Sequence, residues 1–203
     1  MKHKGLTITL LALFCVFVWI IGSEAAVDSI SSCLVRLHIV ANSDSESDQA
    51  AKLAVRDAVL AYIAELNVEC NKEVFREHFD EITKITEMVL KKYNKDYECK
   101  ISFEKCYFPT KQYENIILPA GEYDAVRILL GNAKGENWWC VMSPPLCFTN
   151  ETRGEIKAQD LKKLEEGMGK ENYALICDEE NIKIKPAFKL VEWWQELKHA
   201  ICG

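Results

Sequence analysis

The feature that most constrains this chain is an apolar run near its amino terminus, from Leu6 to Gly22, interrupted only by two threonines. A run of this length is close to the roughly 17 to 25 residues that cross a bilayer, so it belongs in a membrane and not on a folded, water-exposed surface. Ser23 and Ala25 also fit the small-residue positions of a signal-peptide cleavage site after Ala25. A removed signal and a retained anchor are both compatible with the sequence, and in both cases the fold begins after this segment.

The charges around the run set its orientation. Lys2 and Lys4 precede it, whereas Glu24 and Asp28 follow it. Because positively charged flanks stay on the cytoplasmic side, we expect the rest of the chain to lie outside the cytoplasm. The cysteine count agrees with export: of nine cysteines only Cys15 lies in the run, which leaves an even number for a compartment where disulfides form.

Composition and spacing also limit the class of protein. The net charge is −6, and no stretch interleaves Lys and Arg with aromatic residues, so nucleic-acid binding is not expected. The cysteines form no C-x-x-C pair, and the histidines have no companion ligands at zinc-finger spacing. We predict neither a metal site nor a cofactor.

Periodicity predicts the elements that follow the apolar run. Apolar residues alternate with polar ones from 33 to 41 and again from 97 to 104, as in strands with one buried face. Between them, residues 49–66 and 71–93 carry apolar residues at helical spacing, each after a capping residue. We expect two long helices here.

The second half predicts fewer elements. Residues 123–142 resemble a β-hairpin with a glycine-bearing loop, and residues 155–166 resemble a surface helix. The whole predicts an α+β protein in which a mostly antiparallel sheet is covered by two long helices. We divide the chain into residues 1–26, the signal peptide or anchor, and residues 27–203, a single extracytoplasmic domain.

The stretch "NWWCVMSPPLCF", residues 137–148, mixes residue types that no single element requires. Trp138 and Trp139 are neighbours on a predicted strand, so their rings should point to opposite faces, and one of them is either buried under a helix or used in binding. Cys140 and Cys147 could form a disulfide around Pro144 and Pro145, or remain two buried thiols.

The stretch "VRLHIVANSDSESDQ" places Arg36 and His38 on one face of a strand, with Asn42 just beyond it. These three side chains either form a polar cluster or face solvent. The acidic residues that follow lack the glycine and the distal glutamate of a calcium loop, so capping of the next helix explains them better.

Two long motifs together resemble a known family. Residues 35–60, "VRLHIVANSDSESDQAAKLAVRDAVL", and residues 118–148, "LPAGEYDAVRILLGNAKGENWWCVMSPPLCF", with "FPTKQY" at 108–113, are similar to the stage II sporulation protein R family of endospore-forming bacteria. The resemblance implies a signalling protein that is exported from the forespore into the intermembrane space. Its implied partner is the membrane-embedded aspartic protease that removes the pro-sequence of sigma-E in the mother cell.

The resemblance and the residue patterns together suggest where such a partner binds. An activator needs no catalytic group of its own, so we predict no enzyme activity and expect an exposed contact surface. Membrane contact through residues 6–22 is a further expectation. The residues predicted to form or support the contact surface for the protease are Arg36, His38, Asn42, Trp138, Trp139, Pro144 and Pro145.

Two other classes of function compete with this prediction. The first is a thiol-dependent enzyme or cell-wall hydrolase that uses Cys140 as nucleophile and His38 as base. The second is a binding module for a small molecule.

Overall fold

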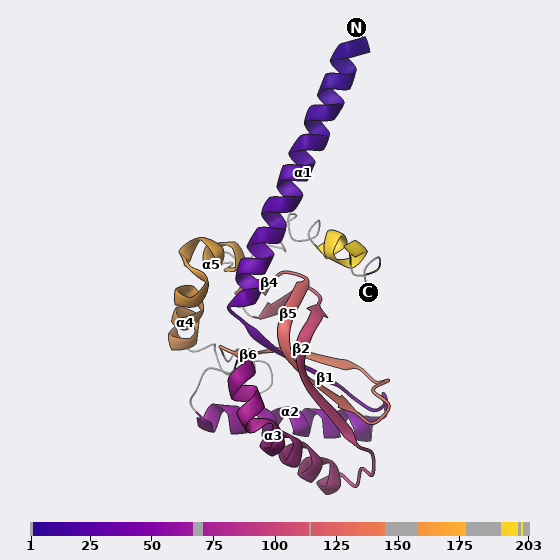
Figure 1. Ribbon diagram of the computed structural model, residues 1–203. Coiled ribbons are helices and arrows are strands. Elements are labelled where there is room, and N and C mark those ends of the chain that lie inside the picture. The colour runs from indigo at the N-terminus through magenta and orange to yellow at the C-terminus, as the bar shows by residue number, and fades with distance from the viewer. Residues whose placement is uncertain are drawn as a thin grey trace.

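A long helix, α1 (Lys2–Ser32), projects from a mixed α/β body in the computed structural model (Figure 1). The structure describes residues 2–66, 71–113, 115–144, 158–177, 192–198 and 200. The chain continues with one strand, two helices, five consecutive strands and then further helices. Its architecture is the predicted α+β fold with a mostly antiparallel sheet.

The main sheet has four strands in the order β2-β5-β1-β6. Their bounds are β1 (Val35–Val40), β2 (Cys99–Phe108), β5 (Gly121–Leu130) and β6 (Asn137–Ser143). β2 pairs antiparallel with β5, and β6 pairs antiparallel with β1, but β1 and β5 run parallel.

The predicted hairpin over residues 123–142 is wrong. β5 and β6 both form, but β1 lies between them and pairs with each. The loop that connects β5 to β6 therefore crosses the end of β1 instead of making a tight turn. Alternating sequence marks a strand, but it does not say which strand lies beside it.

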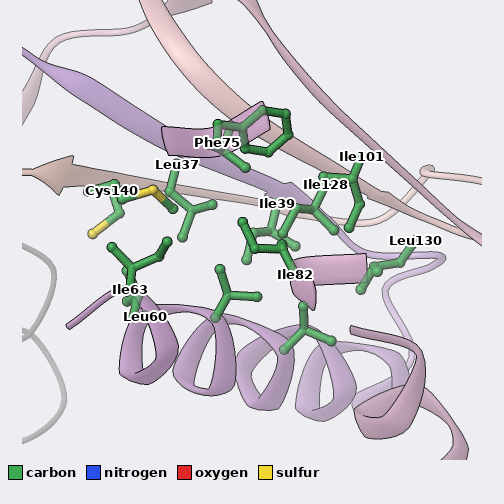
Figure 2. Close-up of a cluster of buried hydrophobic side chains, with 14 of the residues drawn as sticks. Leu37, Ile39, Leu60, Ile63, Phe75, Ile82, Ile101, Ile128, Leu130 and Cys140 are labelled. Atoms are coloured by element: carbon green, nitrogen blue, oxygen red, sulfur yellow. The ribbon is translucent and has the colours of Figure 1, made fainter. Parts of the chain in front are cut away.

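Two helices of 21 residues, α2 (Glu46–Leu66) and α3 (Lys72–Lys92), cover one face of this sheet. Both begin at side-chain caps: Ser45 Oγ accepts from the amide of Asp48 at 3.2 Å, and Asn71 Oδ1 accepts from the amide of Val74 at 2.9 Å. Between the helices and the sheet lies the larger hydrophobic core, to which β1 contributes Leu37 and Ile39 (Figure 2).

A second core lies on the opposite face of the sheet. It includes the end of α1, the short hairpin of β3 (Lys111–Tyr113) and β4 (Ile116–Leu118), and the helices α4 (Ala158–Met168) and α5 (Lys170–Ile176). Phe108, Tyr113 and Tyr123 are its large aromatic residues. All six residues of β1 are buried, because this strand is covered on both faces.

α1 joins the apolar run to the body without a break. Val27 and Ile30, in its last turns, are buried against the second core and β5. Adding a Cβ at Gly121 would bring it within 2.7 Å of the Val27 side chain, so the start of β5 needs a glycine for this contact. By length and composition α1 could cross a membrane. The domain boundary predicted between residues 26 and 27 falls inside this helix and stays a prediction.

Truncating the centre of β1 should destabilise the fold strongly. Ile39 is fully buried, so Ile39→Ala removes buried methyl groups and leaves a cavity, and we expect a loss of about 2 to 5 kcal/mol in the free energy of unfolding. Urea denaturation of the purified protein measures this loss. Met88→Ala on the exposed side of α3 is the control and should change stability by less than about 0.5 kcal/mol. Equal effects of the two substitutions would contradict the burial of β1 in the core beneath α2 and α3.

Candidate functional site

The pairing of β1 with β6 brings the two conspicuous sequence motifs side by side. His38 lies opposite Trp139, and Arg36 lies opposite Val141. Most of the predicted contact residues therefore do gather in one region, although they are far apart in sequence. They divide between the two faces of the sheet.

Arg36 is fully buried on the face opposite α2 and α3. Its Nε donates to the carbonyl of Cys140 at 2.9 Å, and its Nη2 donates to the Tyr113 hydroxyl at 2.8 Å. The guanidinium lies 4.2 Å from the ring centroid of Phe108 and 4.8 Å from that of Tyr123. Among the residues that the structure describes, no carboxylate pairs with Arg36, so hydrogen bonds and aromatic faces stabilise its charge.

This arginine links three elements. Tyr113, which accepts from Arg36, also donates its hydroxyl hydrogen to the carbonyl of Trp139 at 3.3 Å. Burial raises the pKa of the Tyr113 phenol, although the nearby guanidinium acts in the opposite direction. The hairpin β3-β4 is thereby tied to both β1 and β6. The sequence predicts that Arg36 forms or supports the contact surface. It has no exposed surface with which to touch a partner, so it can only support that surface.

His38 lies on the same face and is 6% exposed. Its ring stacks on Trp139 with centroids 3.8 Å apart and planes 17° apart, and Phe108 packs edge-on against both rings. Nε2 lies 2.7 Å from Oδ1 of Asn137 and, because that oxygen is an acceptor, Nε2 carries the hydrogen. Burial lowers the pKa of His38 to about 4, although the bond to Asn137 raises it. His38 is therefore neutral at pH 7 and lies beneath Trp139.

Trp138 points to the other face, as the alternation predicted. It packs against the core beneath the helices, and its ring lies 4.2 Å from the guanidinium carbon of Arg56 on α2. Arg56 is itself buried and is paired with Asp57. Trp138 therefore packs β6 against α2, whereas Trp139 packs β6 against the second core.

Cys140 also points to the helix side, opposite Leu37. His38 points to the other side of the sheet, so the structure contradicts a Cys140–His38 catalytic pair. Cys140 is moreover disulfide-bonded and is not a free nucleophile. The predicted partner Cys147 lies outside the described residues, and the pairing stays a prediction. Of the two prolines, Pro144 is described and partly exposed, and Pro145 lies outside the described residues.

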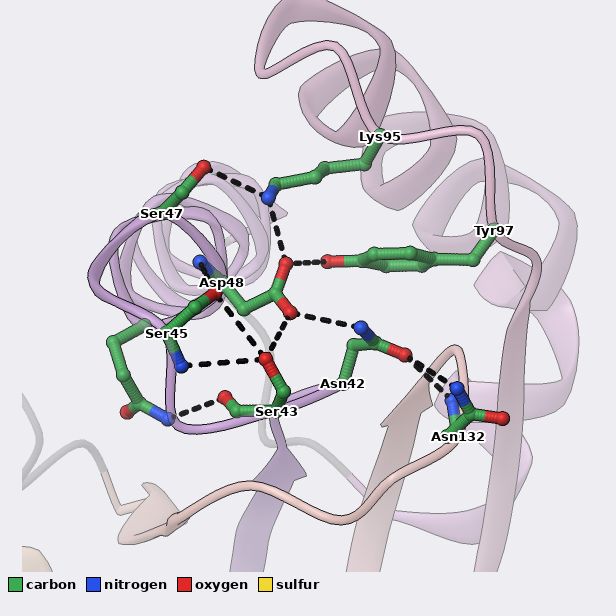
Figure 3. Close-up of polar contacts among 9 residues, drawn as sticks. Asn42, Ser43, Ser45, Ser47, Asp48, Lys95, Tyr97 and Asn132 are labelled. Atoms are coloured by element: carbon green, nitrogen blue, oxygen red, sulfur yellow. Dashed lines mark hydrogen bonds and ion pairs between the residues drawn. The ribbon is translucent and has the colours of Figure 1, made fainter.

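Asn42 belongs to a polar cluster at the end of β1 whose centre is Asp48 (Figure 3). Asp48 accepts from Ser43 Oγ at 2.6 Å and from Asn42 Nδ2 at 2.8 Å, and it forms an ion pair with Lys95 at 2.7 Å. The Tyr97 hydroxyl donates to Oδ1 of Asp48 at 3.1 Å, the same oxygen that Lys95 contacts. Burial alone would raise the pKa of this carboxyl, but these donors outweigh burial and hold the pKa well below its usual value.

The turn that follows β1, residues 42–45, also binds the loop of residues 131–136 that crosses the end of β1. Oδ1 of Asn42 accepts from the backbone and side-chain nitrogens of Asn132, and Asp44 accepts from the amide of Glu136 at 2.7 Å. Lys52 Nζ on α2 donates to the Glu136 carbonyl at 3.1 Å.

Two glycines allow this close approach. Gly131 has φ of +54° and lies against the Asn42 side chain, so a side chain there would be both strained and crowded. A Cβ at Gly135 would collide with the Ser43 backbone carbonyl, which cannot move aside as a side-chain tip can. The glycines of "GNAKGEN" are therefore needed by the crossing over β1.

Sequence reasoning missed several of these residues. It read Asp48 only as part of an acidic cap, and it gave no role to Arg56, to Lys95 or to the aromatic residues around Arg36. The available signal was a charged or polar residue inside an apolar pattern: Arg56 lies on the apolar side of its helix, and Arg36 lies on a strand that is buried throughout. Their partners are distant in sequence and follow no local rule.

The motifs that hold these clusters also identify the family. A family model described as "Stage II sporulation protein R" matches residues 31–153. This chain belongs to the stage II sporulation protein R family. Stage II sporulation protein R of Bacillus subtilis (strain 168) is 42% identical over 135 residues, which are 64% of this chain and 60% of that relative. No solved structure matches the chain significantly.

The family match covers the whole main sheet and both covering helices. Within it, residues of the two long motifs join elements of the fold: Arg36 joins strands, Trp138 joins a strand to a helix, and Asn42 joins a turn to a loop. Trp139 stays partly exposed. In this chain these residues therefore have a structural role, apart from any partner that they bind.

Replacing the Asp48 carboxylate should weaken the fold markedly. Asp48→Asn leaves the largely enclosed ammonium of Lys95 without its ion-pair partner, with only the Ser47 hydroxyl still bonded to it, and we expect a loss of about 3 kcal/mol at pH 7. The folded pKa is lowered, so the contribution of Asp48 is complete above the ordinary carboxyl pKa of 3.8 and is lost as pH falls below it. Urea titrations from pH 7 to pH 2 should show the difference between variant and wild type shrinking below about pH 4. Asp124→Asn is the control, because its ion pair with Lys105 is exposed and 3.6 Å long.

His38 should make stability depend on pH in a different window. Its folded pKa of about 4 lies below the ordinary 6.5, so the unfolded chain binds the proton first and stability falls as pH drops from 6.5 to 4. The expected total is about 2 to 3 kcal/mol. His38→Gln, which cannot titrate, should remove this slope from urea midpoints measured across the window. A variant with the wild-type slope would show that the folded protein protonates His38 normally.

Proposed function

We propose that this protein is an exported signalling protein of the forespore. It acts in the intermembrane space and activates the membrane-embedded aspartic protease that removes the pro-sequence of sigma-E in the mother cell. The observation that carries this proposal is membership of the stage II sporulation protein R family, through a match over residues 31–153. Membership supports a role in sporulation, and the activation step is our proposal.

The amino-terminal helix supports export. α1 contains the apolar run, and its basic residues precede that run while its acidic residues follow it. This arrangement supports our proposal that the folded body lies on the extracytoplasmic side of the forespore membrane. From there it can reach a protease embedded in the membrane that faces it.

The burial of the motif residues supports contact through one region of the sheet. Trp139 and Pro144 are both partly exposed, and Pro144 directly follows the end of β6. We propose that Trp139, Pro144 and Pro145 form the contact surface for the protease, and that Trp138, on the opposite face of β6, supports it by packing against α2. His38 stacks on Trp139, Arg36 bonds to the Tyr113 hydroxyl that contacts the Trp139 carbonyl, and Asn42 holds the loop that leads to β6.

The thiol-enzyme alternative has no supporting observation. Its nucleophile and its base point to opposite faces of the sheet, and its sulfur is bonded. The lowered pKa keeps the His38 ring neutral, and a neutral ring can be buried against Trp139. Packing therefore explains His38 without a catalytic role.

The activation proposal is tested by reconstitution in a bacterium that does not form spores. The exported chain, the candidate protease and its pro-sigma substrate are produced together, and cleavage of the substrate is followed by immunoblot. We expect cleavage that depends on the chain and on its export, because a form that begins after residue 26 stays in the cytoplasm. Equal cleavage with and without the chain would contradict the proposal.

The same assay tests the contact surface. Combining Trp139→Phe with Pro145→Ala keeps an aromatic residue in the core but alters the surface, and we expect processing to fall by roughly tenfold, as for the loss of about 1.4 kcal/mol of contact energy. Met88→Ala, an exposed apolar residue on α3, is the matched control. Circular dichroism and the amount of exported protein must be unchanged in both. Normal processing by the double variant would move the contact surface elsewhere.

A further inference from the structure

The helical segment of residues 192–198 lies beside α1, close to the point where the apolar run ends (Figure 1). Two side chains attach it there. Trp194 Nε1 donates to Oε1 of Glu24 at 3.1 Å, and Lys198 Nζ lies 3.2 Å from the same oxygen. The segment is therefore held at the level of Glu24 along α1.

That level matters if α1 crosses a bilayer. The apolar run ends at Gly22, and Glu24 lies two residues further, about 3 Å along the helix axis at 1.5 Å per residue. When the run fills the hydrocarbon core, Glu24 lies at its extracytoplasmic boundary, where headgroups begin. The segment of residues 192–198 then lies at the same depth.

The free face of this segment carries two apolar residues. Trp193 is 63% exposed and Leu197 is 37% exposed, and because they are four residues apart they share one side of the helix. Gln195, in contrast, is buried. Tryptophan prefers the boundary between hydrocarbon and water, where its ring is in an apolar layer and its N–H stays hydrated.

We propose that Trp193 and Leu197 insert into the headgroup region of the bilayer that α1 crosses, on its extracytoplasmic side. Together with α1 they give the body two attachments to one membrane, which set its orientation as well as its distance from the surface. The proposal requires that α1 be retained. It does not depend on the protease, and it concerns residues beyond the family match.

A lipid surface fits these residues better than a protein partner does. Two side chains of this size bury a few hundred Å² at most, which is well below the roughly 800 Å² per partner of a stable protein interface. Interfacial insertion needs only the partial burial of a tryptophan and a neighbouring aliphatic residue. The membrane is also already present at this position, because α1 brings it there.

Photocrosslinking of the full chain in vesicles tests the proposal. The photoreactive residue p-benzoylphenylalanine replaces Trp193 in one sample and Met88 in another, since these side chains are 63% and 60% exposed. Met88 lies on α3, at the end of the body away from α1 (Figure 1). In vesicles of phosphatidylcholine and phosphatidylglycerol, we expect mass spectrometry to find lipid adducts at position 193 and none above background at position 88.

Four results would overturn the proposal. They are no lipid adduct at position 193, equal lipid adducts at both positions, an adduct between two copies of the chain at position 193, and recovery of a membrane-free chain that has lost α1. Because the vesicles contain no protease, each of these results leaves the activation proposal untouched. Failure of the processing assay would likewise leave the lipid contact standing.

Discussion

The structure depends on a strand that is buried on both faces while carrying charged and polar side chains. β1 lies between β5 and β6, so Arg36 and His38 cannot reach water and must be satisfied inside the protein. Nε and Nη2 of Arg36 bond to a carbonyl and a phenol, two aromatic faces contact its guanidinium, and His38 is kept neutral against Trp139. Nη1 of Arg36 and Nδ1 of His38 have no hydrogen-bond partner among the described residues. An unpaired buried cation is costly, so the elements that supply these partners are held in one arrangement.

The same requirement explains why the conspicuous motifs lie far apart in sequence and close together in space. β1 leads directly into the Asn42 to Asp48 turn, and that turn receives the loop that crosses β1 on its way to β6. Asp48 is the point at which the turn, α2 and the connection between α3 and β2 meet, through Ser43, Lys95 and Tyr97. Substitution at one motif therefore disturbs the others, which makes structural and partner-binding roles hard to separate without matched controls.

A folded body joined directly to a long helix suits the action by contact that we propose. α1 extends from the second core through its buried residues Val27 and Ile30, so the body is joined to the apolar segment by helix and not by a flexible linker. If that segment is retained, the orientation of the body at the membrane is set by α1 and by the segment of residues 192–198 that is bound to Glu24. The protease that we propose as partner would then meet one fixed surface.

The sequence by itself determined the elements, because these follow from local periodicity and capping. It predicted the membrane segment, both long helices, the strand at β1, the α+β class and the opposite directions of Trp138 and Trp139, and its long motifs pointed to the family. Only the tertiary structure decided that β1 separates β5 from β6, that Arg36 is enclosed by aromatic residues and that Cys140 and His38 face apart. Arg36 contacts Cys140 and Tyr113, which are 104 and 77 residues away, and no local pattern encodes such pairings, because they arise from burial of the whole sheet.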